Sequence, residues 1–393
     1  MLQSIALLLL SGLFLGFICS KIRIPALLGM IVAGMIAGPY GLNLLDGSIL
    51  DISAQIRQIA LIIILTRAGL NLDINDIKKV GRPAILLSFV PATFEIIGTV
   101  IFAPMLFGIT IYEALLLGSV IAAVSPAVVV PKMLELMEKR YGTKEGIPQM
   151  ILAAASVDDI YVIILFSIFT SLVQTGNLNL ISLFNIPLSI VSGILVGIVA
   201  GVLLKNLFQI GKIKDMNQFL VTLSVSFLLV YLETILKDYL AMSGYLAIMS
   251  MGIVINQTMQ EDSKQLAKKY TSLWAGAQIF LFTLVGASVN LDYALKAGPY
   301  AILLIVLCLC VRMCGVLISL LKTAFNRKER VFCMLAYTPK ATVQAAIGGI
   351  ALSLGLACGE LVLSIAVVSI LITAPFGAFA MDLTYQKFLK KEV

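Results

Sequence analysis

Hydrophobic residues in this chain form long, nearly continuous runs that short polar connections separate. A run of about 20 apolar residues is the length that an α-helix needs to cross the hydrocarbon core of a bilayer. We predict thirteen spans, near residues 2–20, 26–39, 54–70, 83–107, 112–137, 148–173, 186–206, 217–236, 239–257, 270–289, 299–321, 331–354 and 360–380. The short alternating segments of a membrane β-barrel are absent from the sequence. The pattern therefore indicates an all-α polytopic membrane protein.

Composition supports the same class. Hydrophobic residues make up 60% of the chain and charged residues only 12%, which excludes a soluble domain of 393 residues with a polar surface. Residues 1–20 have the length of a signal peptide, but no cleavage site with small residues follows them. Another apolar run begins almost at once, so we expect these residues to be the first span.

Basic residues lie almost entirely in alternate connections, which predicts how the chain is oriented. These connections carry Lys21 and Arg23; Lys78, Lys79 and Arg82; Lys132, Lys139, Arg140 and Lys144; Lys205, Lys212 and Lys214; Lys264, Lys268 and Lys269; Lys322, Arg327, Lys328 and Arg330; and Lys387, Lys390 and Lys391. The opposite connections carry only Lys237 and Lys296. By the positive-inside rule, the N-terminus lies outside the cell membrane and the C-terminus in the cytoplasm. The net charge of +7 then reflects orientation and contact with membrane lipids, and we expect no nucleic-acid partner.

The span at 148–173 contains two consecutive carboxylates, Asp158 and Asp159, close to its middle. An ionised Asp at the centre of a membrane helix costs about 2.5–3.5 kcal/mol, so the pair needs cations or protons as partners. Adjacent helical residues point about 100° apart, so one carboxylate can face an aqueous cavity while the other faces a neighbouring helix. The chain has no His, so carboxylates or amines must carry any response to pH near neutrality.

An internal repeat is visible at a fixed offset. Residues 67–73 (RAGLNLD) are echoed by residues 286–292 (GASVNLD), 219 positions later. Residues 25–34 are loosely echoed by residues 244–253 at the same offset. These echoes predict two six-helix repeats joined by a linker helix near 186–206. Because the linker adds one crossing, the second repeat enters the membrane from the opposite side, and the repeats are inverted.

Prolines interrupt the fifth and the twelfth spans at matching points of the two repeats. The predicted helix breaks involve Pro126 and Pro131, and Thr338 and Pro339. Proline frees backbone groups that lipid cannot satisfy, so a broken helix belongs inside protein or against a water-filled cavity. Broken helices at equivalent points of inverted repeats predict a crossing, and with it an ion site, at the membrane midplane.

Several polar residues accompany these breaks. Lys340 lies within the second break, where an amine implies an anion nearby. Ser125, at the first break, and Ser156, one helical turn before Asp159, are candidate oxygen ligands for an ion.

A second charged pair is expected deep in the membrane. Glu95 is in the middle of the fourth span and Arg312 in the middle of the eleventh, at pseudo-symmetric positions of the repeat. Each charge is expensive alone in lipid, and a hydrogen-bonded pair is the economical arrangement. We therefore predict a structural ion pair between them.

The segment Ala155-Ser-Val-Asp-Asp159, taken with Tyr337-Thr-Pro-Lys-Ala-Thr-Val-Gln-Ala-Ala346, resembles the monovalent cation/proton antiporter superfamily. The similarity is to the branch with an Asp-Asp pair and a Lys, and above all to NHA-type sodium/proton exchangers. It implies that Asp159 carries Na⁺ or Li⁺ and protons, and that Asp158 pairs with the amine of Lys340. Several relatives have Thr-Asp at the first break, where this chain has Ser125 followed by proline, so the charge at the crossing differs.

The resemblance also implies a homodimer in which a core domain moves like an elevator against a dimerisation domain. The expected dimerisation domain comprises residues 1–82 (spans 1 to 3) and 207–292 (spans 8 to 10). The expected core comprises residues 83–173 (spans 4 to 6) and 293–393 (spans 11 to 13 and the cytoplasmic tail). Residues 174–206 form the linker helix.

Counting charges at this site predicts the coupling ratio. A cation that binds between the carboxylates would take Asp158 from Lys340, whose amine could then release its proton together with that of Asp159. We predict this scheme, in which two protons are exchanged for one cation and the exchange is electrogenic. If Lys340 instead stays charged and compensates the helix dipoles, the ratio is one to one and the exchange is electroneutral.

Several other functions compete with Na⁺/H⁺ exchange. A K⁺/H⁺ antiporter and a sodium-coupled organic-anion symporter of similar architecture remain alternatives, the latter separable by a proton requirement without an organic substrate. An intramembrane aspartyl protease needs two Asp residues on facing helices, whereas these are adjacent on one helix. A channel would favour a ring of like charges over broken helices with a Lys. Phosphate-binding loops, metal-ligand clusters and Ser-His-Asp patterns are absent, so we expect neither an enzyme nor a cofactor.

Overall fold

The computed structural model describes residues 1–22, 24–72, 81–175, 180–211, 213, 215–236 and 242–391, and these residues form helices and connections with no strand among them. Side chains are not described at positions 156, 160, 180–187 and a few other places. Within the described residues, nine helices are long and apolar enough to cross a membrane. Each predicted span contains a helix or a group of short helices, which confirms the all-α membrane class.

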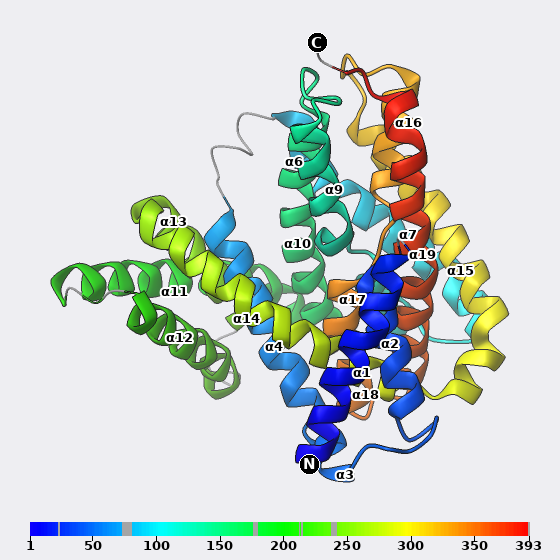
Figure 1. The fold of residues 1–393 in the computed structure, drawn as a ribbon, viewed down its shortest axis with the longest axis horizontal. Helices are drawn as coiled ribbons and strands as arrows, with labels where there is room; N and C mark the ends of the chain where they lie inside the picture. The colour runs from blue at the N-terminus through cyan, green and yellow to red at the C-terminus, as the bar shows by residue number, and fades with distance from the viewer. Residues whose placement is uncertain are drawn as a thin grey trace. The chain divides into compact units, whose positions relative to one another are not determined.

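Contacts divide the chain into two compact units. Unit 1 comprises Met1–Ala54, Asn75–Gln174 and Ile279–Val393, and unit 2 comprises Gln55–Ile74 and Thr175–Gln278. Helices of unit 1 are α1 (Leu2–Lys21), α2 (Ala26–Ala37), α3 (Gly47–Asp51), α6 (Arg82–Leu87), α7 (Val90–Phe107), α8 (Ile111–Ile121), α9 (Pro126–Glu138), α10 (Ile147–Thr175), α15 (Leu291–Ser319), α16 (Arg327–Ala336), α17 (Thr342–Ile347), α18 (Ile350–Ser353) and α19 (Gly359–Phe388) (Figure 1). Helices of unit 2 are α4 (Ser53–Asn71), α11 (Leu180–Ile210), α12 (Asp215–Leu236) and α13 (Gly244–Thr258). Helix α14 (Gln260–Ala287) begins in unit 2 and ends in unit 1.

Two helices of unit 1 are interrupted, as the prolines predict. Residues 122–125 separate α8 from α9, and residues 337–341 separate α16 from α17. Pro126 is the first residue of α9, where its missing N–H costs nothing. The prediction that Pro131 marks a break is wrong, because it lies inside α9. Proline inside a membrane helix can be tolerated when neighbouring protein groups satisfy the freed carbonyl, so it need not end the helix.

The first halves of both broken helices begin with the same motif. Thr110 and Glu113 form a capping box at the start of α8, and Asn326 and Glu329 form one at the start of α16. In each, the first side chain accepts a hydrogen bond from the third backbone N–H, and the Glu accepts one from the cap N–H. These bonds satisfy N–H groups that a helix start leaves without partners, so both half-helices have fixed starting points.

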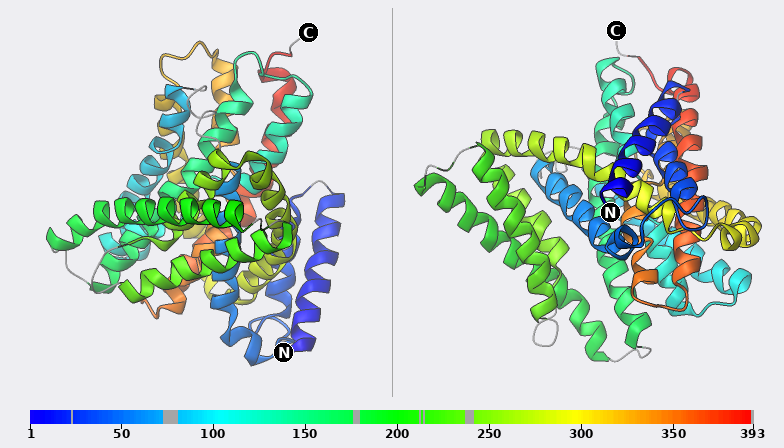
Figure 2. Two further views of the ribbon diagram at one scale, coloured as in Figure 1. Left: turned by 90° about the vertical axis from the view of Figure 1, so that its left-hand side faces the viewer. Right: turned by 60° about the horizontal axis from the view of Figure 1, so that its bottom comes forward.

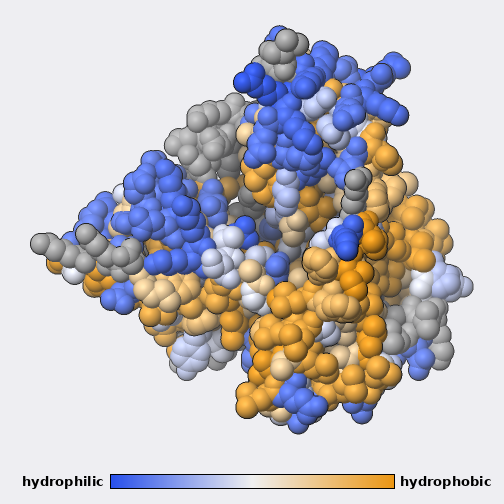
Figure 3. Space-filling view, in the orientation of Figure 1, coloured by the Kyte–Doolittle hydropathy of each residue, from blue (hydrophilic) through white to orange (hydrophobic). Residues whose placement is uncertain are grey.

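One end of unit 1 gathers the connections that carry basic residues. There the segment after α19 is bound to the α9–α10 connection, with Gly142 N donating to Lys390 O at 2.8 Å. Lys132 of α9 forms an ion pair with Asp382 of α19. Figure 3 shows hydrophilic residues gathered at the end of unit 1 where α16 begins, and hydrophobic residues over α1 and α15. The helix α1 begins at the opposite end of the unit from the end of α19 (Figures 1 and 2).

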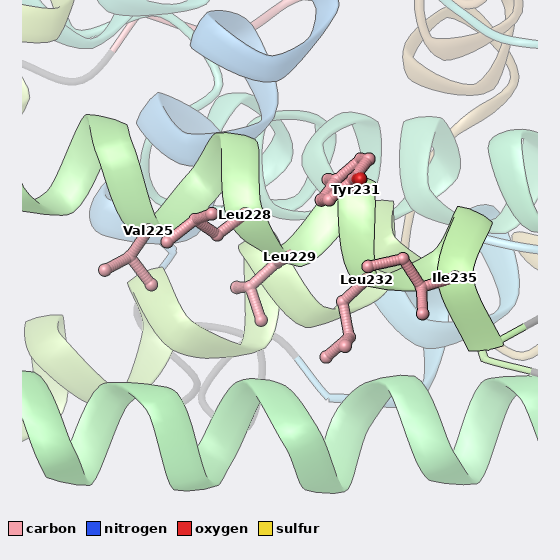
Figure 4. Close-up of a pocket in the computed structure, with 6 residues that line it drawn as sticks. All are labelled: Val225, Leu228, Leu229, Tyr231, Leu232 and Ile235. Atoms are coloured by element: carbon pink, nitrogen blue, oxygen red, sulfur yellow. The ribbon is translucent and has the colours of Figure 1, made fainter.

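Buried hydroxyl groups connect the helices of unit 2. Thr66 Oγ1 of α4 and Ser226 Oγ of α12 are 3.1 Å apart, and Ser263 of α14 donates to Leu70 O at 3.0 Å. Helix α12 lines an apolar hollow of about 320 Å³ (Figure 4) with Val225, Leu228, Leu229, Tyr231, Leu232 and Ile235. Aliphatic side chains of this kind suit contact with lipid tails.

Candidate functional site

The two helix breaks cross and contact each other inside unit 1. Ser125 N donates to Pro339 O at 2.8 Å, and Thr342 N lies 3.5 Å from Ser125 Oγ. Ser125, Thr342 and Lys340 are all buried. The crossing therefore brings together residues that are more than 200 positions apart in the chain.

Side chains satisfy the unwound backbone of the first break. Three consecutive carbonyls accept hydrogen bonds from side chains: Ile121 O from Lys340 Nζ (2.5 Å), Ala122 O from Arg312 Nη1, and Ala123 O from Gln344 Nε2 (2.8 Å). The N–H of the next residue, Val124, donates to Asp158 Oδ2 at 2.7 Å. Non-helical backbone at membrane depth is tolerated only when protein or water satisfies it in this way. Two of the donors are cations at the C-terminal end of α8, where the helix dipole is negative.

Arg312 is the centre of the charged network. Its guanidinium donates to Glu95 Oε2 at 2.8 Å and lies 3.5 Å from Asp158 Oδ2, and all three side chains are fully buried. Its Nε donates to Tyr337 O at 2.9 Å, so Arg312 binds the ends of both α8 and α16. The predicted ion pair of Glu95 with Arg312 is therefore present, but it belongs to a larger set of contacts.

Lys340 has a different partner from the one the family resemblance implies. Its Nζ forms an ion pair with Glu95 Oε1 at 2.7 Å, and the described residues give it no ion pair with Asp158. Asp158 is instead held by Arg312 and by the N–H of Val124. The expected pairing of Asp158 with Lys340 is corrected accordingly, because Glu95 lies between the two cations and binds each with one oxygen.

The two adjacent aspartates of α10 have different surroundings. Asp158 is fully buried and has two partners, whereas Asp159 is only partly buried and has no hydrogen bond or ion pair among the described residues. The Oδ1 atoms of both carboxylates are buried without a donor. This difference follows from the 100° turn between neighbouring helical residues.

The other predicted site residues are placed as follows. Ser125 lies at the crossing, and Thr338 and Pro339 lie in the second break. The side chain of Ser156 is outside the described residues. Two further residues of the site were not predicted: Gln344, which lies in the motif that carries the family resemblance, and Thr373, whose Oγ1 accepts a hydrogen bond from Lys340 N at 3.0 Å. The sequence signal for Gln344 is its amide side chain within the apolar run that follows Lys340, because a polar residue there needs a partner.

Among the charged side chains described at the crossing, there are three carboxylates and two cations. Glu95 and Asp158 are balanced by Arg312 and Lys340, which leaves the negative charge of Asp159 without a fixed counter-charge among the described residues. A single proton or a single monovalent cation at Asp159 would balance it. The total charge of the site is therefore the same whether Asp159 holds a proton or a monovalent cation.

Comparisons with known proteins agree on one group. The family described as "Sodium/hydrogen exchanger, transmembrane" matches residues 5–381. The chain is 32% identical to the mouse (Mus musculus) "Sodium/hydrogen exchanger 9B2" over 390 residues, which cover 94% of this chain and 69% of that protein. It is 33% identical to the human (Homo sapiens) "Sodium/hydrogen exchanger 9B1", with 94% of this chain and 73% of that protein covered.

A solved structure has the same fold. The sodium proton antiporter MjNhaP1 of Methanocaldococcus jannaschii superposes with a TM-score of 0.83 at 20% sequence identity, covering 98% of this chain and 97% of that one. The likeness extends over essentially the whole chain.

Proposed function

Because this chain belongs to the sodium/hydrogen exchanger family, we propose that it exchanges Na⁺ or Li⁺ for H⁺ across the cell membrane by alternating access. Members of this family are multi-pass membrane transporters and not enzymes. The observation that carries the proposal is Asp159, a carboxylate without a fixed partner beside a set of buried charges that balance one another. Na⁺ and H⁺ compete for this carboxylate, and Asp158 Oδ1 supplies a second oxygen to the cation.

Inverted repeats support alternating access, and contacts at the crossing support the repeats. Near a two-fold axis, a residue contacts its own symmetry mate or that mate's neighbours. Hydrogen-bonded residues at the crossing are separated by 217, 219, 221 and 217 positions, for Glu95 with Arg312, Ile121 with Lys340, Ala123 with Gln344, and Ser125 with Thr342. These separations are close to the offset of 219 between the repeated segments. The capping boxes that begin α8 and α16 have a similar spacing.

Close helix packing follows the same relation. A Cβ on Gly286 of α14 would lie 2.1 Å from Ile31 O of α2, and one on Gly69 of α4 would lie 2.5 Å from Met249 O of α13. Under the proposed repeat, α2 corresponds to α13 and α4 to α14, so the two contacts are equivalent. Each requires glycine because the backbone of the partner helix occupies the space of a side chain.

The inverted repeat also supports a proposal for the number of spans, the domains and the orientation of the chain. We include thirteen membrane spans, a linker helix at 174–206, and an elevator motion of a core domain (83–173 and 293–393) against a dimerisation domain (1–82 and 207–292) in a homodimer. The opposite ends of unit 1 at which α1 begins and α19 ends support an outer N-terminus and a cytoplasmic C-terminus. The basic connections near the end of α19 support that orientation.

Exchange by the purified protein in liposomes tests the function. With a proton gradient across the membrane and a pH-sensitive dye, we expect added Na⁺ and Li⁺ to dissipate the gradient and K⁺ to leave it nearly unchanged. Liposomes without protein give the background. An equal or larger response to K⁺ would favour the K⁺/H⁺ alternative, and a response that appears only with an organic anion would favour the symporter.

The contacts of Lys340 favour one proton for each cation. Electrogenic exchange requires Lys340 to lose its carboxylate when the cation binds, but its ion-pair partner is Glu95, which Arg312 also holds. A cation at Asp159 need not disturb that pair, so Lys340 keeps its proton. We therefore propose one-to-one, electroneutral exchange in place of the two-proton scheme.

A sudden rise of Na⁺ over protein adsorbed on a solid-supported membrane measures this coupling. We expect no sustained charge transfer at Na⁺ concentrations that drive dye-detected exchange, and no effect on the exchange rate when the membrane potential is clamped. A current that grows in proportion to the exchange rate would restore the electrogenic scheme.

A further inference from the structure

Thr342 carries a buried hydroxyl that has no partner in the part of the chain that the structure describes. The residue is 2% exposed, and Thr342 Oγ1 makes no hydrogen bond with any of the described residues. Other buried threonines of unit 1 behave differently: Thr99, Thr170 and Thr373 each donate to the carbonyl four residues earlier in their own helix. That local bond is the ordinary way in which a helical hydroxyl is satisfied inside a membrane protein.

The position of Thr342 explains why this local bond is missing. It is the first residue of α17 and directly follows the second break, so no helical turn precedes it to offer a carbonyl. A buried polar group without a partner destabilises the protein by roughly 1–3 kcal/mol, so a helix start that keeps one calls for an explanation. Valine would fill the same volume without this cost.

The surroundings of Thr342 are rich in acceptor oxygens. Its N–H lies 3.5 Å from Ser125 Oγ, and the residue before Ser125, Val124, donates to Asp158 Oδ2 at 2.7 Å. Asp158 Oδ1 and Gln344 Oε1 are likewise buried without a donor, and Gln344 is fixed to the same break through Ala123 O. These three oxygens are therefore buried at the crossing without a hydrogen bond among the described residues, and oxygens in that state suit a small cation.

We propose that the hydroxyl oxygen of Thr342 is a neutral ligand of the transported alkali cation, supplementing the carboxylates of α10. This inference rests on the proposed Na⁺/H⁺ exchange. A cation that leaves water needs several oxygens to replace its hydration shell. Two carboxylates alone would supply few of these oxygens, and each added carboxylate would change the charge of the site. A hydroxyl adds an oxygen from the second broken helix and leaves the charge balance unchanged.

Thr342→Val tests this role, because it removes the oxygen and keeps the branched shape. Since Thr342 Oγ1 makes no hydrogen bond among the described residues and valine removes the cost of burying it, the variant should melt at or above the temperature of the wild type in the absence of Na⁺. We expect the Na⁺ concentration for half-maximal exchange to rise about tenfold, a loss of about 1.4 kcal/mol. The rise in melting temperature that Na⁺ causes should shrink correspondingly.

Two further variants make the result specific. Thr342→Ser retains the oxygen and should stay within about twofold of the wild type, on the scale where tenfold is 1.4 kcal/mol. Thr170→Val removes a buried hydroxyl on α10 about 16 Å from Asp159, at 1.5 Å per residue, and should leave Na⁺ dependence unchanged. Equal half-maximal Na⁺ concentrations for Thr342→Val and Thr342→Ser would overturn the inference while leaving exchange itself intact. Absence of Na⁺-dependent exchange in the wild type would instead overturn the proposed function.

Discussion

Replacing Asp159 with Asn should abolish exchange without unfolding the protein. The amide keeps the shape of the side chain but can neither carry a proton nor neutralise a cation. Asp159 makes no ion pair among the described residues, so its loss breaks no structural contact. In the dye assay, we expect the rate of the variant to equal that of liposomes without protein.

Asp51→Asn is the matched control for this experiment. It makes the same chemical change at an exposed carboxylate of unit 1, and it should keep both the exchange rate and the melting temperature. Melting curves in detergent and the Na⁺-induced rise in melting temperature should be recorded for both variants. Appreciable Na⁺/H⁺ exchange by Asp159→Asn would remove Asp159 from the role of ion carrier.

Arg312→Met should cause a large loss of stability. The substitution takes a partner from Glu95 and Asp158 and removes the donors to Ala122 O and Tyr337 O. Breaking a buried ion pair by removing one partner costs about 3–5 kcal/mol, because the remaining charge is left without compensation. We expect the melting temperature in detergent to fall by roughly 10 °C, on the scale of about 2–4 °C per kcal/mol for large domains. Arg327→Met, at an exposed position of α16, should leave it unchanged.

The double variant Glu95→Met with Arg312→Met separates a simple pair from a network. For an isolated pair, replacing both partners with apolar residues would recover much of the loss. Here Lys340 also depends on Glu95, and two carbonyls of the breaks depend on Arg312, so we expect little recovery. A double variant that melts close to the wild type would mean that Lys340 and the breaks do not need these partners.

The sequence by itself determined the class of the protein and the identity of its charged residues. Apolar runs long enough to cross a bilayer have one stable solution, because lipid cannot satisfy an open backbone, and so the helices could be located from hydrophobicity alone. The same energetic cost makes every charge inside a span conspicuous. Glu95, Asp158, Asp159, Arg312 and Lys340 could therefore be identified without a structure.

The tertiary structure decided which of these charges touch. Five charges within one crossing allow several pairings, and sequence offers no distance to choose among them. Packing of α7 and α15 puts Glu95 between Arg312 and Lys340, so the expected pairing of Lys340 with Asp158 does not form. Pro131 could not be assigned for a similar reason, since whether a proline ends a helix depends on what surrounds the freed carbonyl.

The polar residues of α17 show the same division. Gln344 and Thr342 stand out in the sequence only as polar residues in an apolar run, and the fold carries them to the first break, more than 200 residues away in the chain. Only then does one amide cap a carbonyl and one hydroxyl remain without a partner. Sequence fixes the cost of burying a polar group, whereas the partner that offsets the cost comes from elsewhere in the chain and is set by the fold.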